Sequence, residues 1–386
     1  MSPAPNSRRT ALSALAAFVA AGTALPRVQA QPAQPGWVVG ISRPYTGPLK
    51  GVAAGYVEAA KALFDHVNAQ GGIAGARLEL IEKDDEGVPA HTEAQVKALA
   101  SDPRVLALIG VAGTGNVLAA LPALEAARLP LVGPFSGAAA LRGANQRMLF
   151  HVRAGYDDEI NAIAQTMVER APGGKVVVLY QDDPFGAGAY GAFLKEASGK
   201  GPRMSVSAFK FDRTSGSLAD PVAAQQALKV ADAVLLVAAP KSAAALLTMV
   251  RAEGRRSTVY TLSVVDALAL VKDVGANVAN GTVITQVMPN PRKSALKVVR
   301  DYRALMEATK QPLSYAGLEG YIAARVVIEG LSRIKGSPSR DKLVAALEDL
   351  GRGDLGGFAF SYSRKSHEGS KFVDLSLVSA SGSIID

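Results

Sequence analysis

Two short loops carry hydroxyl side chains that could bind a small anion. Thr114 stands between two glycines, and Ser136 stands between Phe135 and Gly137. Each loop follows an apolar run that predicts a strand, and the first loop leads into a predicted helix. Hydroxyls beside free backbone N–H groups at a helix N-terminus can bind a carboxylate. The same composition also suits ordinary helix caps, so these residues alone leave both interpretations open.

Other residues that could do chemistry lack the spacing that the chemistry needs. Two positions before Ser136 stands Pro134, where a nucleophile elbow requires glycine. The four histidines show no metal-ligand spacing, and the chain contains no cysteine. We therefore expect no metal site, no thiol chemistry and no enzymatic activity.

Residues 186–191 read G-x-G-x-x-G, which is the pattern of a dinucleotide-binding turn. That turn must follow its strand directly, whereas residues 181–185 separate these glycines from the apolar run 176–180. Asp182 and Asp183 would also repel a pyrophosphate. We interpret the glycines as part of a helix start and expect no cofactor.

Short apolar runs alternate with longer amphipathic segments along most of the chain, which predicts an α/β fold with parallel sheets. So many strand–helix units favour two doubly wound sheets, with crossings between them at 153–156 and near 286–291. Thr92 and Gln95 form a candidate capping box, and 363–369 is a polar turn between two tail strands. The predicted strands are 38–41, 78–81, 105–109, 131–132, 176–180, 204–211, 233–237, 259–262 and 282–285; the predicted helices include 52–68, 117–127, 157–170, 190–197, 224–229, 242–253, 295–309, 318–334 and 343–350.

The first 30 residues predict export. Arg8 and Arg9 precede an uncharged run at 10–25, and Ala30 ends a small-residue cleavage site. This signal peptide resembles the twin-arginine type, although the general secretion route stays open. The 386 residues, 48% hydrophobic and 20% charged, have the composition of a globular protein. Lysines and arginines are scattered among acids, which excludes a nucleic-acid-binding patch. We expect a periplasmic monomer.

Several stretches together resemble the leucine/isoleucine/valine-binding family of type I periplasmic solute-binding proteins. The most specific of them is Asn-Ala-Gln-Gly-Gly-Ile-Ala-Gly at 68–75. The others, in the same order and spacing as in that family, are 42–48, Asp84-Asp85, 110–116, 134–138 and 182–186. The resemblance covers essentially the whole mature chain and implies two lobes joined by three crossings. We expect lobe 1 to comprise 37–153 and 287–363, and lobe 2 to comprise 154–286 and 364–386.

The resemblance implies a binding site in the cleft between the lobes and an ABC permease in the inner membrane as partner. Thr114 falls where the family binds the ligand carboxylate through a hydroxyl, and Phe185 falls where an aromatic ring closes over the ligand. The remaining residues that it assigns to the site are Tyr45, Phe135, Ser136, Gly137, Pro240 and Ser263. The implied ligand is an amino acid of branched-chain type or a related small carboxylate.

Two positions depart from the family pattern. Ser263 stands at or near the position of the carboxylate that pairs with the ligand ammonium, and Pro240 stands where an aromatic residue is common. An ammonium left unpaired in a closed cleft is costly, so Asp183, Asp266 or an acid at 157–159 would have to pair with it. A carboxylate ligand without an ammonium, aromatic or otherwise, is the alternative. A ligand sensor for a membrane receptor would use the same architecture.

Overall fold

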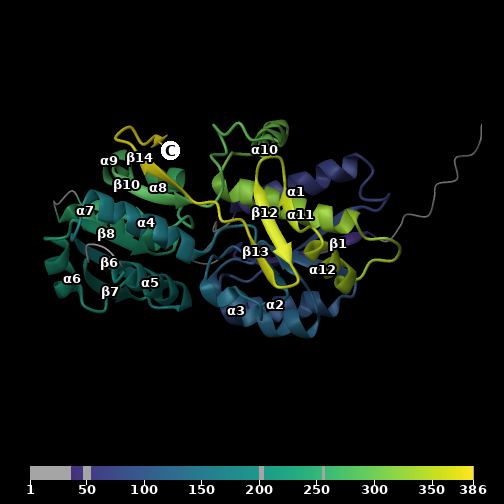
Figure 1. Ribbon diagram of the computed structural model, residues 1–386, viewed down its shortest axis with the longest axis horizontal. Helices are drawn as coiled ribbons and strands as arrows, with labels where there is room; N and C mark the ends of the chain where they lie inside the picture. Colours follow the sequence, from purple (N-terminus) through teal and green to yellow (C-terminus); the bar gives the residue numbers. More distant parts are fainter. Residues whose placement is uncertain (1–35, 47–53, 200–203, 254–256, 386) are drawn as a thin grey trace, which may run out of the picture. The chain divides into compact units, whose positions relative to one another are not determined.

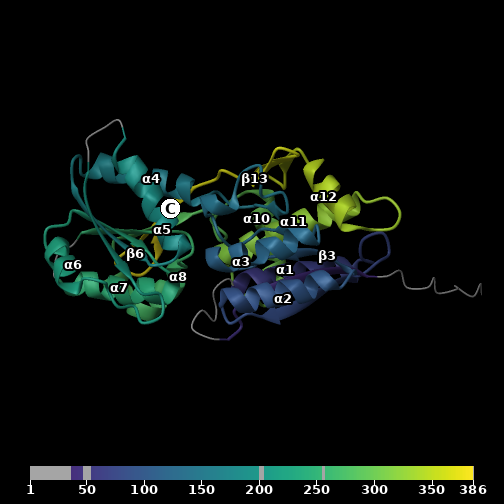
Figure 2. The same ribbon diagram turned by 90° about the horizontal axis from the view of Figure 1, so that it is seen from below.

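The computed structural model describes residues 36–46, 54–199, 204–253 and 257–385. The expected signal peptide at 1–30 therefore lies outside the described residues. The described helices and strands form two lobes, each built on its own sheet (Figure 1, Figure 2).

Lobe 1 contains a five-stranded sheet in the order β2-β1-β3-β4-β5, and every strand pair is parallel. Helices α1 and α11 pack against each other, and so do α2 and α3. The strands are β1 (Trp37–Arg43), β2 (Leu78–Asp84), β3 (Val105–Ile109), β4 (Leu131–Val132) and β5 (Leu149–Phe150); the helices are α1 (Ala54–Ala69), α2 (Pro89–Ser101), α3 (Thr114–Ala126), α10 (Lys297–Ala308), α11 (Tyr315–Ser332), α12 (Arg340–Glu348) and the 3₁₀ turn η1 (Ala139–Leu141).

Lobe 2 contains a seven-stranded sheet in the order β15-β14-β10-β9-β8-β6-β7. Its central strands are parallel, whereas β14 runs antiparallel to β10. The strands are β6 (Lys175–Gln181), β7 (Ser205–Phe211), β8 (Ala233–Val237), β9 (Thr258–Thr261), β10 (Thr282–Gln286), β14 (Asp374–Val378) and β15 (Ile384–Ile385); the helices are α4 (Tyr156–Arg170), α5 (Pro184–Ala197), α6 (Pro221–Leu228), α7 (Pro240–Ala252), α8 (Ala267–Val274) and α9 (Ala276–Ala279).

The central strands are buried on both faces. Every residue of β3, β8 and β10 is buried, as their continuous apolar runs predict for parallel sheets covered by helices. The carboxyl ends of such strands are where open α/β sheets carry their binding loops. Within the described part of the chain, no helix has the length and apolarity needed to cross a membrane.

The chain crosses between the lobes three times, and the third crossing differs from our expectation. The first two lie between β5 and α4 and between β10 and α10, close to the predicted positions. A third sheet, formed by β11 (Arg352–Asp354), β12 (Ala359–Ser363) and β13 (Ser366–Gly369), extends lobe 1. Because β13 pairs with β12, the last crossing follows Gly369 rather than residue 363.

Local differences from the predicted elements have identifiable causes. Helix α2 begins at Pro89, which suits the first helical position, so Thr92 lies inside the helix and is not its cap. Residues 363–369 contain strand β13 rather than a continuous turn, since His367 is buried and stacks on Phe150 with ring centroids 3.9 Å apart. Helix α5 begins at Pro184, six residues before the predicted start at Tyr190.

The G-x-G-x-x-G glycines lie inside helix α5. The side chain of Asp183 caps this helix by accepting a hydrogen bond from the backbone N–H of Gly186. A Cβ on Gly186 would lie 1.9 Å from the carbonyl oxygen of Gln181, whereas Gly188 and Gly191 have no atom within 4 Å of that position. Gly186 is therefore needed for close packing of the helix start, whereas the sequence predicted a flexible entry ahead of a helix that begins at Tyr190.

Candidate functional site

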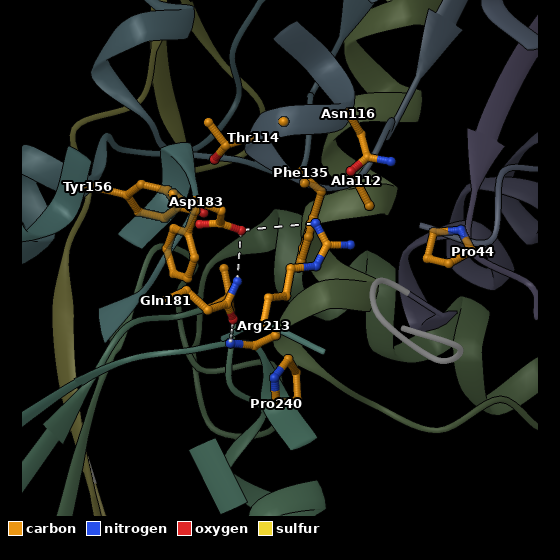
Figure 3. A pocket seen from close by; sticks show the side chains of 15 residues that line it. Pro44, Ala112, Thr114, Asn116, Phe135, Tyr156, Gln181, Asp183, Arg213 and Pro240 are labelled. Carbon is orange, nitrogen blue, oxygen red and sulfur yellow. Dashed lines mark hydrogen bonds and ion pairs between the residues drawn. The ribbon is translucent and has the colours of Figure 1, made fainter. Parts of the chain in front are cut away.

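A cavity opens between the lobes at the carboxyl ends of their strands (Figure 3). The cavity has a volume of about 70 Å³, and a cavity of roughly 10–15 Å³ is enough to hold one water molecule. A small organic molecule therefore fits. The lining residues are Pro44, Ala112, Gly113, Thr114, Gly115, Asn116 and Phe135 from lobe 1 and Tyr156, Gln181, Asp183, Phe185, Arg213, Ala239, Pro240 and Val264 from lobe 2.

A pair of hydroxyls lies on the lobe 1 side. Thr114 is the first residue of α3, and its Oγ1 lies 2.8 Å from Oγ of Ser136, so the two side chains are hydrogen-bonded. Gly113 precedes the helix with a φ of 100°, a left-handed conformation that favours glycine. The hydroxyl pair thus stands where the helix N-terminus and its free N–H groups attract negative charge.

A buried carboxylate supports this wall. Asp85 accepts hydrogen bonds from the hydroxyls of Ser42 and Thr92, both at 2.9 Å, and from the backbone N–H of Gly87. The amide of Asn116 in turn donates to the hydroxyl of Thr92 at 2.7 Å. Burial raises the pKa of Asp85. The network ties the end of β1, the loop after β2 and helix α2 to the start of α3, so it fixes Asn116 at the cavity.

Three aromatic rings form an apolar wall. Phe135, from lobe 1, and Tyr156, from the start of α4 in lobe 2, are labelled in Figure 3. Phe185 comes from the start of α5 in lobe 2. The rings of Tyr156 and Phe185 are tilted by 54° with centroids 5.1 Å apart. Apolar atoms of a ligand would be removed from water against these rings.

Two oppositely charged side chains face the cavity from lobe 2. The carboxylate of Asp183 accepts hydrogen bonds from Gly186 N–H and from Nε2 of Gln181, at 2.9 and 2.8 Å. The guanidinium of Arg213 lies 4.0 Å from the same carboxylate and donates to the Gly87 carbonyl oxygen of lobe 1 at 2.7 Å (Figure 3). The charges of Asp183 and Arg213 cancel, so the walls carry no net charge.

The structure brings together most, but not all, of the residues that the sequence assigned to the site. Thr114, Phe135, Phe185 and Pro240 line the cavity, and Ser136 is buried behind Thr114. A further assigned residue, Gly137, packs against Tyr156: its carbonyl accepts from the backbone N–H of that residue, and a Cβ there would lie 2.8 Å from it.

Tyr45 and Ser263 lie outside the cavity lining, and their neighbours Pro44 and Val264 contribute to it instead. The hydroxyl of Tyr45 donates to Glu82, and its ring lies 3.8 Å below the guanidinium of Arg43. Ser263 is bound by Glu159, which accepts hydrogen bonds from both its backbone N–H and its hydroxyl. Neither side chain is therefore placed to contact a ligand in this cavity.

Ser263 belongs to a buried ionic cluster behind the aromatic wall. Arg153, from the first crossing, donates to Ser263 and to Glu159 of α4, and its guanidinium lies 3.7 Å from the carboxylate of Glu319 on α11. Arg153 also lies 5.2 Å from the ring centroid of Phe135. Burial raises the pKa of Glu319 to about 7. The cluster therefore joins both lobes at the crossing.

The acids considered as partners for a ligand ammonium have different environments. Asp266 caps helix α8, Asp158 caps α4, and Glu159 is bound within the ionic cluster. Of the candidate acids in the described residues, Asp183 lines the cavity. No group of three or more His, Asp or Glu side chains in this part of the chain gathers in a way that could hold a metal ion.

Sequence reasoning missed four polar or aromatic residues of the lining: Asn116, Tyr156, Gln181 and Arg213. Gln181 ends β6, and Arg213 follows β7 by two residues. Because carboxyl ends of parallel strands meet at one edge, these two positions carried a usable signal. Tyr156 could be found only once the first crossing was known to pass beside the cavity.

Comparisons with known proteins all find similarity to periplasmic or amino-acid-binding proteins. A family model described as "Periplasmic binding protein" matches residues 36–380. A solved structure of a possible leucine/isoleucine/valine-binding protein from Rhodopirellula baltica is 29% identical, with a TM-score of 0.83 over 91% of this chain and 96% of that one. A substrate-binding periplasmic protein from Ralstonia solanacearum is 30% identical, with a TM-score of 0.82 over 90% and 99% of the two chains.

A curated relative, the "Amino acid binding protein" of Pseudomonas aeruginosa, is 24% identical over 152 residues. That match covers 39% of this chain and 40% of the relative's length.

Proposed function

The chain belongs to the periplasmic binding protein family, and from this premise we propose that it binds a small carboxylate-bearing solute in the interlobe cavity and delivers it to an ABC permease. The family and its structural neighbours are solute-binding proteins rather than enzymes, and they work in the periplasm. Their fold is the two-lobed α/β architecture described above, which confirms the resemblance seen in the sequence.

The observation that carries the proposal is the hydroxyl pair of Thr114 and Ser136. Thr114 lines the cavity at the N-terminus of α3, and Ser136 is buried behind it and holds its hydroxyl by a hydrogen bond, whereas most of the remaining lining is apolar. Hydrogen bonds to a charged acceptor contribute about 1.5–3 kcal/mol each, and the helix dipole adds to them. A carboxylate is the acceptor that suits the Thr114 hydroxyl, which Ser136 orients, together with the free backbone N–H groups of a helix start.

An amino acid is the first candidate ligand. Its carboxylate would bind at Thr114, its ammonium would pair with Asp183, and its side chain would contact the aromatic wall. The name of the Rhodopirellula baltica relative, which points to leucine, isoleucine and valine, supports this class of ligand.

A carboxylate without an ammonium is the second candidate, and one contact favours it. Asp183 already accepts two hydrogen bonds and stands 4.0 Å from the guanidinium of Arg213. A neighbouring cation reduces the attraction of that carboxylate for a second positive charge. A small aromatic acid would use the same hydroxyl pair and the same rings.

A thermal-shift screen followed by calorimetric titration tests the proposal. The screen compares L-leucine, L-isoleucine and L-valine with benzoate and phenylacetate. A ligand at 100 times its Kd should stabilise the protein by about 2.7 kcal/mol. If no small carboxylate binds while uncharged sugars or amines do, the proposal is wrong.

Uptake of the confirmed ligand by proteoliposomes that contain the permease separates transport from sensing. Transport requires that the purified protein stimulate ATP-dependent uptake. A protein that leaves uptake unchanged but activates a membrane receptor in the presence of ligand would support the sensing alternative.

We also propose that the first 30 residues direct export and are removed after Ala30. Mass spectrometry of the protein from the native periplasm should find Gln31 at the N-terminus. A periplasmic protein that still begins at Met1 would contradict cleavage.

A further inference from the structure

The guanidinium of Arg213 is placed in the cavity without a full set of hydrogen-bond acceptors. A guanidinium has five N–H donors, and within the described residues Arg213 donates to one acceptor, the Gly87 carbonyl. Its distance of 4.0 Å from Asp183 exceeds that of a hydrogen bond. The oxygens of Asp183 are already used by Gly186 and Gln181, so donors of Arg213 remain for a ligand.

The backbone beneath Arg213 is fixed. Asp212 accepts hydrogen bonds from the N–H groups of Thr214 and Ser215, at 3.0 and 2.7 Å, and its own N–H donates to the Ser217 carbonyl. Arg213 therefore projects from a tight loop at the carboxyl end of β7. A donor that is already positioned loses little conformational entropy when a ligand binds.

The residue of lobe 1 that Arg213 contacts, Gly87, is fixed as well. Gly87 donates its N–H to the buried carboxylate of Asp85 at 2.9 Å, and its carbonyl accepts from Arg213. The guanidinium thus spans from lobe 2 to an anchored loop of lobe 1. Its orientation in the closed cavity does not depend on a ligand.

From this geometry we infer that Arg213 determines specificity, and that the preferred ligands are small carboxylates with a second hydrogen-bond acceptor, such as a carboxylate, amide or keto oxygen. The inference rests on the proposed function and narrows its ligand class. A branched aliphatic side chain at Arg213 would bury donors without giving them an acceptor, which is unfavourable. A polar side chain of the same shape would supply the acceptor and still contact the aromatic rings.

Two sets of three probes, each set with nearly the same shape but different polarity, test the inference directly. L-leucine, L-asparagine and L-aspartate have side chains of nearly equal shape, and so do 4-methylpentanoate, succinamate and succinate, which lack the ammonium. Calorimetric titration of the full chain should give about tenfold to hundredfold tighter binding for the polar members of each set. Comparison between the two sets shows separately whether an ammonium is required.

Variants of Arg213 complete the test. Arg213→Met keeps most of the side-chain length but removes the donors, so it should abolish the preference for polar probes and leave the aliphatic ones unchanged or better bound. Arg213→Lys, which keeps the charge with different geometry, should retain part of the preference. Lys210→Met is the matched control, because Lys210 lies on β7, three residues before Arg213, and forms an exposed ion pair with Asp182 outside the cavity lining.

Three results would overturn the inference. The first is wild-type protein that binds L-leucine or 4-methylpentanoate as tightly as the polar probes. The second is an equal loss for all probes in Arg213→Met, which would make Arg213 a contact between lobes without selectivity. The third is an absence of binding for every carboxylate probe, which would contradict the proposed function itself.

Discussion

At the scale of single residues, the neutral hydroxyls that would bind an anion and the charged side chains of the site belong to different lobes. The hydroxyls of Thr114 and Ser136 on lobe 1 are neutral, whereas Asp183 and Arg213 both belong to lobe 2. The described lining residues of lobe 1 carry no charged side chain, so a ligand carboxylate at Thr114 would meet no negative charge in that part of the cavity wall. Asp183 and Arg213 line the cavity from the second lobe, where they would face the remainder of such a ligand.

Removal of either hydroxyl should weaken binding. Thr114→Ala should raise the Kd of the confirmed ligand by roughly tenfold to a hundredfold, as measured by calorimetric titration. Ser136→Ala should raise it by less, because Ser136 is buried behind Thr114 and acts by orienting the Thr114 hydroxyl. The two hydroxyls bond to each other in a buried position, so each variant should also lose about 0.5–1.5 kcal/mol of stability.

Thr166→Ala is a suitable control, since the Thr166 hydroxyl bonds to the Ala162 carbonyl within α4 and lies outside the cavity lining. It should leave the affinity unchanged. If Thr114→Ala and Ser136→Ala also bind normally, the carboxylate site lies elsewhere.

At the scale of elements, helix starts position the site. Helices α3, α4, α5 and α7 all begin at the cavity, with Thr114, Tyr156, Pro184 and Pro240 as their first residues. Their N-terminal N–H groups cannot all bond within the helix. The positive ends of several helix dipoles therefore lie at the cavity, where they favour a negatively charged ligand group.

The close packing at the start of α5 predicts opposite effects for two glycines of the same helix. Gly186→Ala should destabilise the protein by about 1–3 kcal/mol or more, because its methyl group would overlap the Gln181 carbonyl. Gly188→Ala, with open space around its Cβ, should stabilise by about 0.5–1 kcal/mol. Urea unfolding of both variants measures the difference, and equal effects would contradict the assigned helix start.

At the scale of the whole molecule, the ionic cluster lies at the crossing that joins the lobes. Arg153 is buried between Glu159 of lobe 2 and Glu319 of lobe 1. Buried charges are favourable only when they are well paired, so relative movement of the lobes must preserve these contacts or exchange them for water. The cluster is therefore suited to guide a hinge motion.

Glu319 should make the stability depend on pH. Its pKa is raised from 4.5 to about 7 in the folded protein by burial. The contribution of protonated Glu319 to the free energy of unfolding is fully present below pH 4.5 and is lost as the pH rises through 7. The reason is that Glu319 releases its proton at a lower pH in the unfolded chain than in the folded protein. At about 1.36 kcal/mol per pH unit, the loss is up to about 3 kcal/mol.

Glu319→Gln should remove this loss, so its stability relative to wild type should increase between pH 4.5 and 8 in urea unfolding experiments. Glu329→Gln is the control, because Glu329 pairs with Arg325 near the surface of the same helix. Parallel pH profiles for wild type and Glu319→Gln would show that Glu319 is ionised throughout.

Ligand binding should close the hinge. Small-angle scattering should show a smaller radius of gyration with saturating ligand than without it, because the cavity walls come from both lobes. Ser136→Ala under the same ligand concentration should show less closure. An unchanged radius of gyration at confirmed saturation would count against a clamshell mechanism.

The sequence by itself determined the alternation of strands and helices, because burial of parallel strands requires continuous apolar runs and amphipathic helices over them. It also predicted an anion site at the loops of Thr114 and Phe135, since loops after parallel strands converge at one edge, whereas Phe185 and Pro240 were assigned through the family resemblance. Tertiary structure alone decided that Tyr45 and Ser263 face other partners: one donates to Glu82, the other is bound by Glu159, and both partners are distant in sequence. Likewise, the contact of Arg213 with Gly87 joins residues 126 positions apart. No local pattern encodes such pairings, because they arise only when segments that are distant in the sequence pack together.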